Sequence, residues 1–264
     1  MSVTISVVTA VYNRVDTIAD ALASVGSQTW PNVEHVVIDG GSTDGSLSIL
    51  EACREQFATF VSERDAGIYD ALNKGVSRAT GDVVGFLHAD DLFASPEVLT
   101  RVASAFEDPT VDAVFGDLEY VRQDDPSVVV RYWHAGNFEM RSLRRGWMPP
   151  HPTFYVRRAI YERLGGFDTT YRIAADYDCM LRFLKSGIRV TYIPHLQVKM
   201  RVGGASNRSL GNILKKTQED FRAYRGNGGS VVATLVAICS KNLRKLPQFL
   251  LRSTASQPAG RSRT

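Results

Sequence analysis

The sequence of 264 residues predicts an α/β protein with a mostly parallel, Rossmann-like sheet flanked by helices. Three observations lead to this fold class: apolar runs alternate with helical periods, polar residues follow these runs, and 44% of the residues are hydrophobic. Alternating strands and helices build a parallel sheet that helices cover on both faces. Ligands of such sheets bind at the carboxyl ends of the strands, so the polar residues there are candidates for a site.

The strands and helices alternate regularly as far as about residue 116. Strands are expected at residues 3–8, 33–38, 59–62, 82–87 and 111–115. Apolar residues with a helical period predict helices at residues 16–28, 47–57, 68–78 and 95–106. The pattern is less regular afterwards, with strands expected at residues 128–133 and 189–193 and helices at residues 157–164 and 176–186.

Charge is distributed unevenly along the chain. Residues 1–207 carry 20 Lys/Arg and 26 Asp/Glu, a net charge of −6, whereas residues 208–264 carry 11 and 2, a net charge of +9. Pattern and charge together predict a single domain at residues 1–206, a basic helical extension at residues 207–256 and a disordered tail at residues 257–264.

Neither a secretory signal nor a membrane span is expected. The N-terminal segment MSVTISVVTAVYNR has no basic region and no small-residue cleavage site. The longest apolar run, residues 231–239, is too short to cross a bilayer. The three cysteines lie far apart and form neither a metal-binding motif nor a disulfide framework, which favours a cytoplasmic protein.

The basic extension suggests a partner. Lysine and arginine alternate with apolar residues between residues 215 and 252, and such a helix can lie on the anionic inner face of the plasma membrane. A solvated helix packed against the domain fits the same pattern equally well. Nucleic acid is not expected as a partner, because the acidic body of the chain contains no base-reading motif.

Two adjacent carboxylates, Asp90 and Asp91, follow the strand expected at residues 82–87, in the segment FLHADDL. One interpretation is an exposed loop pair. The other is a divalent cation, Mn²⁺ or Mg²⁺, held by one or both carboxylates and shared with a substrate diphosphate. The position at the carboxyl end of a strand favours the cation site. For His88, a neutral imidazole packed under the loop is expected rather than a third ligand.

The glycine-rich segment GGSTDG at residues 40–45 is not a dinucleotide-binding fingerprint, because Ser42 stands where glycine is required. A tight turn between a strand and a helix explains the segment. Asp39, immediately before it, ends a strand and can accept a hydrogen bond from a base or a ribose.

Five segments together resemble family 2 glycosyltransferases, which have the GT-A fold. They are ISVVTAVYNR (5–14), VVIDGGSTDGS (36–46), ERDAGIYDALNKGVSRATGDVVGFLHADD (63–91), PPHPTFYVRRAIYERLGGFD (149–168) and AADYDCMLR (174–182). The resemblance covers residues 3 to 206 and points to the bacterial branch that builds surface polysaccharides and glycolipids. It implies a nucleotide-sugar-binding half at residues 1–116 and an acceptor-side half at residues 117–206.

The resemblance also implies binding roles on the nucleotide side. Thr9, Tyr12 and Asp39 match positions that hold the nucleotide base. A loop that touches the nucleotide side of the donor is matched by the residues Arg64, Asp65 and Gly67.

Asp90 and Asp91 match the metal-and-ribose motif of the family, which has the form Asp-x-Asp, although His88 stands where the leading acid is expected. The prediction is that Asp91 binds the metal and that Asp90 contacts ribose or metal. Arg201 is a candidate for contact with the diphosphate, since arginine suits phosphate, but a structural role fits equally well.

By the same resemblance, Asp176 matches the general base of inverting members, which often read Glu-Asp where this chain has Ala175 and Asp176. A helix N-terminus, where aspartate is favoured, is the plain alternative. Asp178 lies about 200° further around the helix and cannot face the same substrate atom.

The predicted function is the inverting transfer of a sugar from a nucleotide-sugar donor to a hydroxyl of a lipid-linked, glycolipid or polysaccharide acceptor in cell-envelope glycan biosynthesis. A divalent cation neutralises the leaving diphosphate, and a carboxylate takes the acceptor proton. Two other classes stay open. A sugar nucleotidyltransferase has a glycine-rich loop after its first strand, where this chain has TAVYNR at residues 9–14. The other class is a non-catalytic scaffold that binds glycans or membranes.

Overall fold

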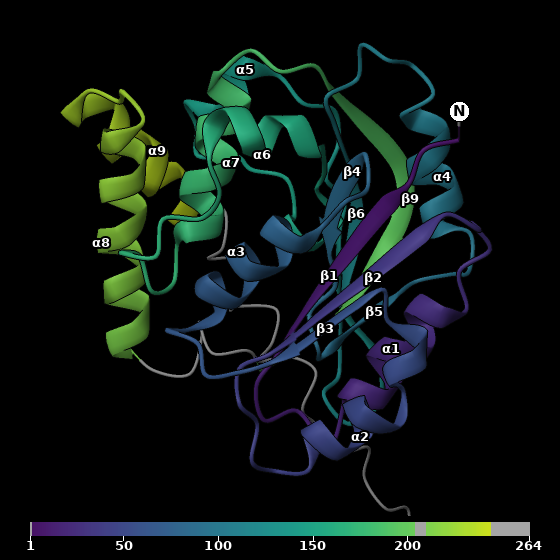
Figure 1. The fold of residues 1–264 in the computed structure, drawn as a ribbon. Coiled ribbons are helices and arrows are strands. Elements are labelled where there is room, and N and C mark those ends of the chain that lie inside the picture. Colours follow the sequence, from purple (N-terminus) through teal and green to yellow (C-terminus); the bar gives the residue numbers. More distant parts are fainter. Residues whose placement is uncertain (1, 204–209, 244–264) are drawn as a thin grey trace, which may run out of the picture.

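A nine-stranded sheet runs through the protein, of which the computed structural model describes residues 2–203 and 210–243 (Figure 1). One half of the sheet is parallel, and its strands follow in the order β3 (Thr59–Ser62), β2 (Val33–Asp39), β1 (Ile5–Val11) and β4 (Val83–Phe86). The predicted α/β fold with a Rossmann-like sheet flanked by helices is confirmed, and the expected parallel pairing holds in this half of the sheet. Strands β1, β2 and β4 are rich in β-branched residues and mostly buried, as a sheet covered on both faces requires.

The other half of the sheet is mixed. β8 (Tyr155–Arg157) pairs antiparallel with both β4 and β6 (Ala113–Val121), and so separates these two strands. β9 (Val190–Arg201) runs parallel to β6 and antiparallel to β5 (Asp91–Phe93). The remaining strand, β7 (Val129–Trp133), pairs with β6 as a hairpin.

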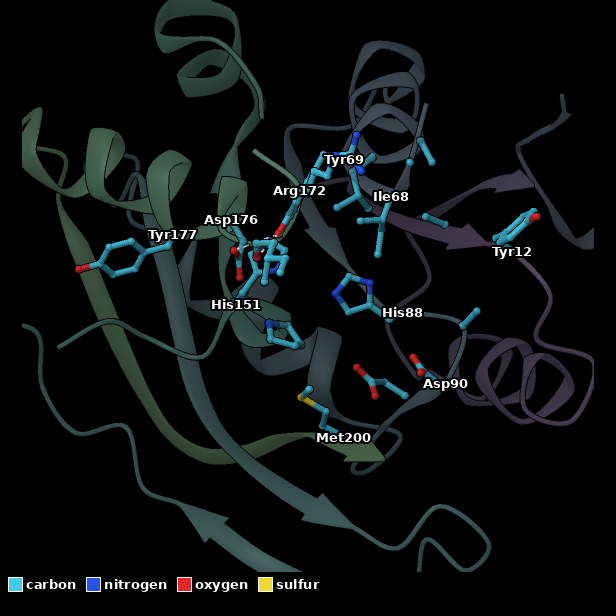
Figure 2. A pocket seen from close by; sticks show the side chains of 18 of the residues that line it. Tyr12, Ile68, Tyr69, His88, Asp90, His151, Arg172, Asp176, Tyr177 and Met200 are labelled. Carbon is cyan, nitrogen blue, oxygen red and sulfur yellow. Dashed lines mark hydrogen bonds between the residues drawn. The ribbon is translucent and has the colours of Figure 1, made fainter. Parts of the chain in front are cut away.

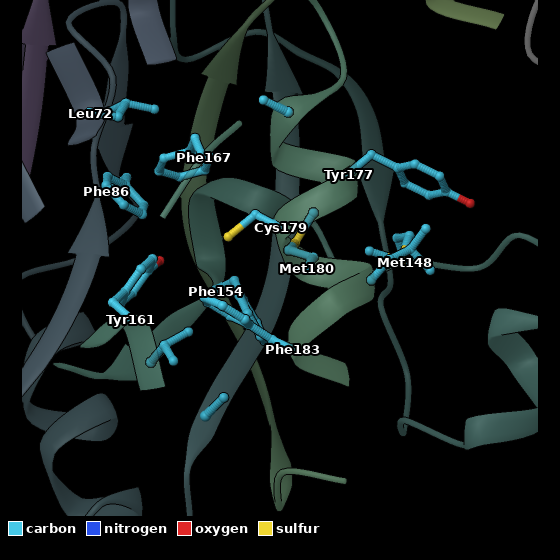
Figure 3. Close-up of a cluster of buried hydrophobic side chains, with 14 of the residues drawn as sticks. Leu72, Phe86, Met148, Phe154, Tyr161, Phe167, Tyr177, Cys179, Met180 and Phe183 are labelled. Carbon is cyan, nitrogen blue, oxygen red and sulfur yellow. The ribbon is translucent and has the colours of Figure 1, made fainter. Parts of the chain in front are cut away.

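Helices cover both faces of the sheet (Figure 1). They are α1 (Ile18–Gly26), α2 (Ser46–Ala52), α3 (Ile68–Arg78), α4 (Val98–Ala105), α5 (Met140–Leu143), α6 (Arg158–Leu164) and α7 (Ala175–Lys185). Short 3₁₀ turns at Arg54–Gln56 and His151–Thr153 complete them. Adjacent strand residues serve opposite faces: Val8 joins the core under α3, α6 and α7, whereas Val7 joins the core under α1 and α4. Figure 3 shows the first of these cores, where Phe86 and Phe167 lie across from α7.

The sequence prediction misses two short strands and the length of two others, of which β6, expected at residues 111–115, extends to Val121. β5 and β8 have three residues each, too few to carry a recognisable alternation. The strand expected at residues 189–193 continues to Arg201, past Pro194. A register shift opposite Gly116 and Asp117 lets β9 pass the proline, which cannot donate a ladder hydrogen bond.

The C-terminal extension forms helices α8 (Leu210–Gly226) and α9 (Val231–Leu243) in its described part. α8 packs against α7, and α9 packs against α8 (Figure 1). The predicted boundary near residue 206 falls in the gap between the two described ranges. The basic segment at residues 244–256 and the tail at residues 257–264 lie outside the described residues. Within residues 2–203 and 210–243, no helix combines the length and the apolar character that a membrane crossing requires.

Candidate active site

A cavity of about 1330 Å³ opens beyond the carboxyl ends of β1, β2 and β4. One wall contains Tyr12 and Arg14 after β1 and Asp90 and Asp91 after β4. The opposite wall contains Asp176 at the start of α7 together with residues of α8 and α9. Figure 2 shows His88 lying between Asp90 on one side and Asp176 on the other. The strand topology therefore brings together chain segments that are more than 80 residues apart.

The acidic doublet has one partly buried and one fully buried member. Asp90 keeps part of its side chain in the cavity, and its Oδ2 lies 3.5 Å from Arg14 Nε. Asp91 begins β5 and is only 2% exposed. Its Oδ1 accepts a hydrogen bond of 3.3 Å from the backbone N–H of Arg201, whereas its Oδ2 has no hydrogen-bond partner among the described residues. Burial, and then the charge of Asp90, raise the pKa of Asp91 well above its usual value.

These residues fit a hard divalent cation. A buried carboxylate oxygen without a partner is costly, and a cation bound at the doublet would supply that partner. In the described part of the chain, no group of three or more His, Cys, Asp or Glu side chains is arranged to hold a metal ion. Two carboxylates are nevertheless enough for Mg²⁺ or Mn²⁺, which take their other ligands from substrate phosphates and water.

Arg201 lies beneath the doublet rather than free in the cavity. Its Nη2 is 2.6 Å from Asp20 Oδ2 on α1, and its Nη1 donates to the backbone oxygen of Asp90 at 3.2 Å. The guanidinium is almost wholly buried, and among the described residues its Nε has no acceptor. Arg201 therefore fixes the backbone of the doublet from below, and its contact with a diphosphate stays a prediction.

The loop after β3 lies on the same side as Tyr12, and its residues Arg64, Asp65 and Gly67 all line the cavity. The carboxylate of Asp65 accepts the backbone N–H of Gly67 at 2.9 Å. It also lies against Gly40, where an added Cβ would come within 2.3 Å of Asp65 Oδ2. Tyr12 is 58% exposed at the mouth of the cavity (Figure 2).

Thr9 and Asp39 are fully buried beside the cavity instead of lining it. The hydroxyl of Thr9 lies 3.0 Å from His35 Nε2. Asp39 Oδ2 accepts hydrogen bonds from the backbone N–H groups of Gly41 and Ser42 and from the hydroxyl of Ser62. Asp39 therefore shapes the loop that follows β2, whereas Thr9 contacts β2 itself. The predicted contact of both residues with the base stays a prediction.

Asp176 is half-buried in the first turn of α7, and a side chain of α3 contacts its carboxylate. Its Oδ1 accepts a hydrogen bond of 3.2 Å from the hydroxyl of Tyr69, which also donates to the backbone oxygen of Ile173. Asp178 behaves differently, because its carboxylate is held by Asn227 at 2.8 Å and by Arg182 at 3.7 Å. Asp178 is absent from the cavity lining, as its place on the helix predicts.

The extension holds the loop in front of Asp176 in place. Glu219 on α8 is buried and accepts hydrogen bonds from the backbone N–H groups of Arg172, Ile173 and Ala174, at 2.8 to 3.2 Å. These donors precede α7 and lack partners within the helix, so one carboxylate caps the helix from outside. The position of Asp176 consequently depends on α8.

Histidines occupy the floor of the cavity. The rings of His88 and His151 lie 5.9 Å apart, and both line the cavity. Burial lowers the pKa of His88, and it lowers the pKa of His151 to about 4. Both rings are therefore neutral at pH 7, as expected for His88. His195 is exposed on β9 and lies outside the cavity lining.

Comparison with known proteins assigns the chain to a family. Residues 6–177 match the family described as Glycosyl transferase family 2. An uncharacterized glycosyltransferase of Mycobacterium tuberculosis is 33% identical over 189 residues, which cover 68% of this chain and 68% of the relative. A PGL/p-HBAD biosynthesis glycosyltransferase of Mycobacterium bovis is 32% identical over 215 residues, covering 76% and 78%. The chain belongs to glycosyl transferase family 2 and is a glycosyltransferase, which decides against a sugar nucleotidyltransferase.

Solved structures agree on the fold, which is of the GT-A type. TarS of S. aureus in complex with UDP-GlcNAc superposes with a TM-score of 0.67 at 17% identity, covering 94% of this chain and 79% of that one. The mannosyltransferase PcManGT of Pyrobaculum calidifontis, in complex with GDP-Man and Mn²⁺, gives a TM-score of 0.66 at 21% identity, covering 98% and 77%. A longer TarS chain is matched over 44% of its length.

Several residues that line the cavity or support its wall are missed by sequence reasoning. Tyr69 and Arg14 lie inside segments that resemble the family, but nothing in the pattern separates them from neighbouring helix or loop residues. Glu219 and Asp220 leave a clearer signal, because they are the two acids among the 57 residues of 208–264. An acidic residue in an otherwise strongly basic segment is a candidate for a specific hydrogen bond or ion pair within the fold.

Proposed function

We propose that this glycosyltransferase moves a sugar, with inversion and with the help of a divalent cation, from a nucleotide-sugar donor to a hydroxyl of a lipid-linked, glycolipid or polysaccharide acceptor. The observation that carries the proposal is the placement of two kinds of carboxylate in one cavity. The doublet of Asp90 and Asp91 has an unpartnered buried oxygen on one wall, and Asp176 stands on the other. The donor sugar and the acceptor hydroxyl can therefore be brought together between the two walls.

On the donor side, Asp91 with Asp90 would hold Mn²⁺ or Mg²⁺ against the diphosphate. When bound, such a cation supplies positive charge that stabilises the leaving nucleotide diphosphate. The proposal is supported by the structural neighbours, whose complexes contain UDP, UDP-GlcNAc or GDP-Man with Mn²⁺. Tyr12, Arg64, Asp65 and Gly67 line the same wall and are placed to contact the nucleotide.

On the acceptor side, Asp176 would act as the general base. Tyr69 occupies Oδ1, which leaves Oδ2 to accept the proton of the attacking hydroxyl. The acceptor oxygen forms a bond to the anomeric carbon, the bond from that carbon to the diphosphate oxygen breaks, and the electron pair leaves with the diphosphate. A single displacement needs no covalent nucleophile and inverts the anomeric centre.

We further propose that the protein works in the cytoplasm at an anionic membrane surface, in cell-envelope glycan biosynthesis. α9 exposes an apolar face of Val231, Val232, Leu235 and Val236, between 50% and 72% exposed. The chain beyond it, residues 244–264, carries five Lys/Arg and no Asp/Glu. An apolar helix face next to a basic segment fits an anionic bilayer. The name of the Mycobacterium bovis relative, a PGL/p-HBAD biosynthesis glycosyltransferase, supports the glycolipid class of acceptor.

A thermal-shift panel of UDP, GDP and dTDP, each with and without Mn²⁺, tests the proposal. A ligand that binds the native state raises the melting temperature. We expect one nucleotide diphosphate to raise it strongly with Mn²⁺ and weakly in EDTA. A melting temperature that no nucleotide changes, in either condition, would contradict the proposed donor.

A further inference from the structure

The end of the cavity formed by the extension is rich in positive charge. Lys215 and Lys216 on α8 line this end together with Arg172, which lies in the loop before α7. Figure 2 shows Arg172 near Tyr69 and Asp176, on the side away from Asp90. The acidic doublet and these cations therefore stand at opposite ends, with the proposed base between them.

The acids next to these cations already have partners. Asp220 lies 2.7 Å from Lys241 Nζ, and that ammonium group stands 3.8 Å above the ring of Tyr177. Glu219 is occupied by the three backbone N–H groups of the loop before α7. Among the described residues, no carboxylate forms an ion pair with the side chains of Lys215, Lys216 or Arg172.

The arrangement is held by the fold. Because the backbone N–H of Arg172 is tied to Glu219, the loop that carries this arginine is fixed against the helix that carries the two lysines. Arg172, Lys215 and Lys216 line one cavity, and an anion bound among them would form charge-assisted contacts. A guanidinium and two ammonium groups that line one cavity offer both bidentate and point-charge contacts to phosphate oxygens.

We propose that Arg172, Lys215 and Lys216 form a binding subsite for an anionic, phosphate-bearing group of the acceptor. The inference rests on the proposed function, because it places the phosphate of the acceptor beyond Asp176 and the acceptor hydroxyl beside it. The diphosphate of the donor belongs to the opposite end, where the doublet and its cation lie. An acceptor phosphate bound at the donor end instead would lie against the carboxylates of Asp90 and Asp91 and be repelled by them.

Isothermal titration calorimetry with octyl phosphate below its micelle concentration tests the subsite. The protein is first saturated with Mg²⁺ and the nucleotide diphosphate that the thermal-shift panel identifies, so that the donor end is filled. We expect octyl phosphate to bind this complex and uncharged octyl glucoside to bind at least tenfold more weakly. The double variant Lys215→Gln/Lys216→Gln should weaken octyl phosphate at least tenfold, and Arg172→Gln should weaken it several-fold.

Matched variants separate the subsite from general charge effects. Arg145→Gln/Arg163→Gln removes two exposed cations outside the cavity lining and should bind octyl phosphate like the wild type. Lys215→Arg/Lys216→Arg keeps the charge and should retain binding. Octyl phosphate that does not bind, or that binds Lys215→Gln/Lys216→Gln unchanged, overturns the inference.

Vesicles of phosphatidylglycerol distinguish an acceptor phosphate from a lipid headgroup. If vesicle binding depends on the two lysines while octyl phosphate does not bind, the cations serve the membrane surface and the acceptor subsite is wrong. Nucleotide binding is measured first in every variant. Its absence from the wild type would contradict the proposed function, whereas loss of octyl phosphate binding alone would overturn only the subsite.

Discussion

The hydroxyl of Tyr69 on α3 lies 3.2 Å from Oδ1 of Asp176 on α7, although 107 residues separate them in the sequence. The same hydroxyl holds the backbone oxygen of Ile173 at 2.7 Å. One side chain of α3 thus contacts both the loop before α7 and the carboxylate at the start of that helix. Burial, followed by the charge of Asp176, raises the pKa of Tyr69 far above its usual range, so the phenol stays protonated and donates.

Replacing Asp176 by Asn should lower kcat by a factor of about 10² to 10⁴, because the acceptor hydroxyl loses its base. Nucleotide affinity, measured by calorimetry, should stay within about twofold. Asp178→Asn is the matched control, since Asp178 is on the same helix but bonds Asn227 outside the cavity lining. Full turnover of Asp176→Asn would place the base elsewhere.

Replacing Asp91 by Asn should abolish sugar transfer while the protein still folds. In EDTA, we expect the melting temperature to stay the same or rise, because a buried carboxylate with an unpartnered oxygen becomes neutral. The increase in melting temperature on adding Mn²⁺ with nucleotide should disappear. A variant that keeps both this increase and its turnover would remove Asp91 from the metal site.

Replacing Glu219 by Gln should destabilise the protein by about 1–2 kcal/mol, since backbone N–H groups bond a charged carboxylate more strongly than an amide. Urea denaturation measures the loss, and kcat should fall with it because the loop that precedes Asp176 loosens. Glu162→Gln is the control, because Glu162 is exposed and forms an ion pair with Arg158 on the surface of α6. Equal stability of the two variants would contradict the anchoring role.

The exposed face of α9 should bind anionic membranes. We expect Val232→Glu/Leu235→Glu to reduce co-sedimentation with phosphatidylglycerol vesicles at least fivefold, because two charges enter an apolar contact. Val128→Glu/Val130→Glu adds the same charges to exposed positions beside and on β7 and should co-sediment like the wild type. Undiminished co-sedimentation of the α9 variant would show that this face does not meet the bilayer.

Acid should destabilise the protein partly through His35. Burial lowers the pKa of His35 to about 4 in the folded state, against about 6.5 in the unfolded chain, so only the unfolded chain takes up a proton between these values. The contribution of His35 to the free energy of unfolding is therefore fully present above pH 6.5. It falls as the pH drops, by about 2 kcal/mol at pH 5. Urea denaturation at pH 7.5 and pH 5 should show a smaller difference for His35→Gln. An unchanged difference would contradict a buried neutral ring.

The sequence by itself determined the parallel half of the sheet, the helices on it and the family. β-branched runs and helical periods are local signals, which is why Thr59–Ser62 and Ile68–Arg78 coincide with their predicted ranges. The sequence also predicts the polar residues that follow these strands, including the acidic doublet of Asp90 and Asp91. The resemblance to the family predicts Asp176 as the base, and the structure shows only that this residue lines the cavity, so its role stays a prediction.

Only the tertiary structure decided which polar groups face the cavity and which are already occupied. Thr9 and Asp39 follow the same sequence pattern as Tyr12 and Asp65, yet packing buries their side chains beside the cavity. The anchors Tyr69 and Glu219 and the cations of α8 depend on segments that meet after long chain separations. The local periodicity of the sequence does not predict such long-range contacts, because they depend on the hydrogen bonds and packing of the assembled fold.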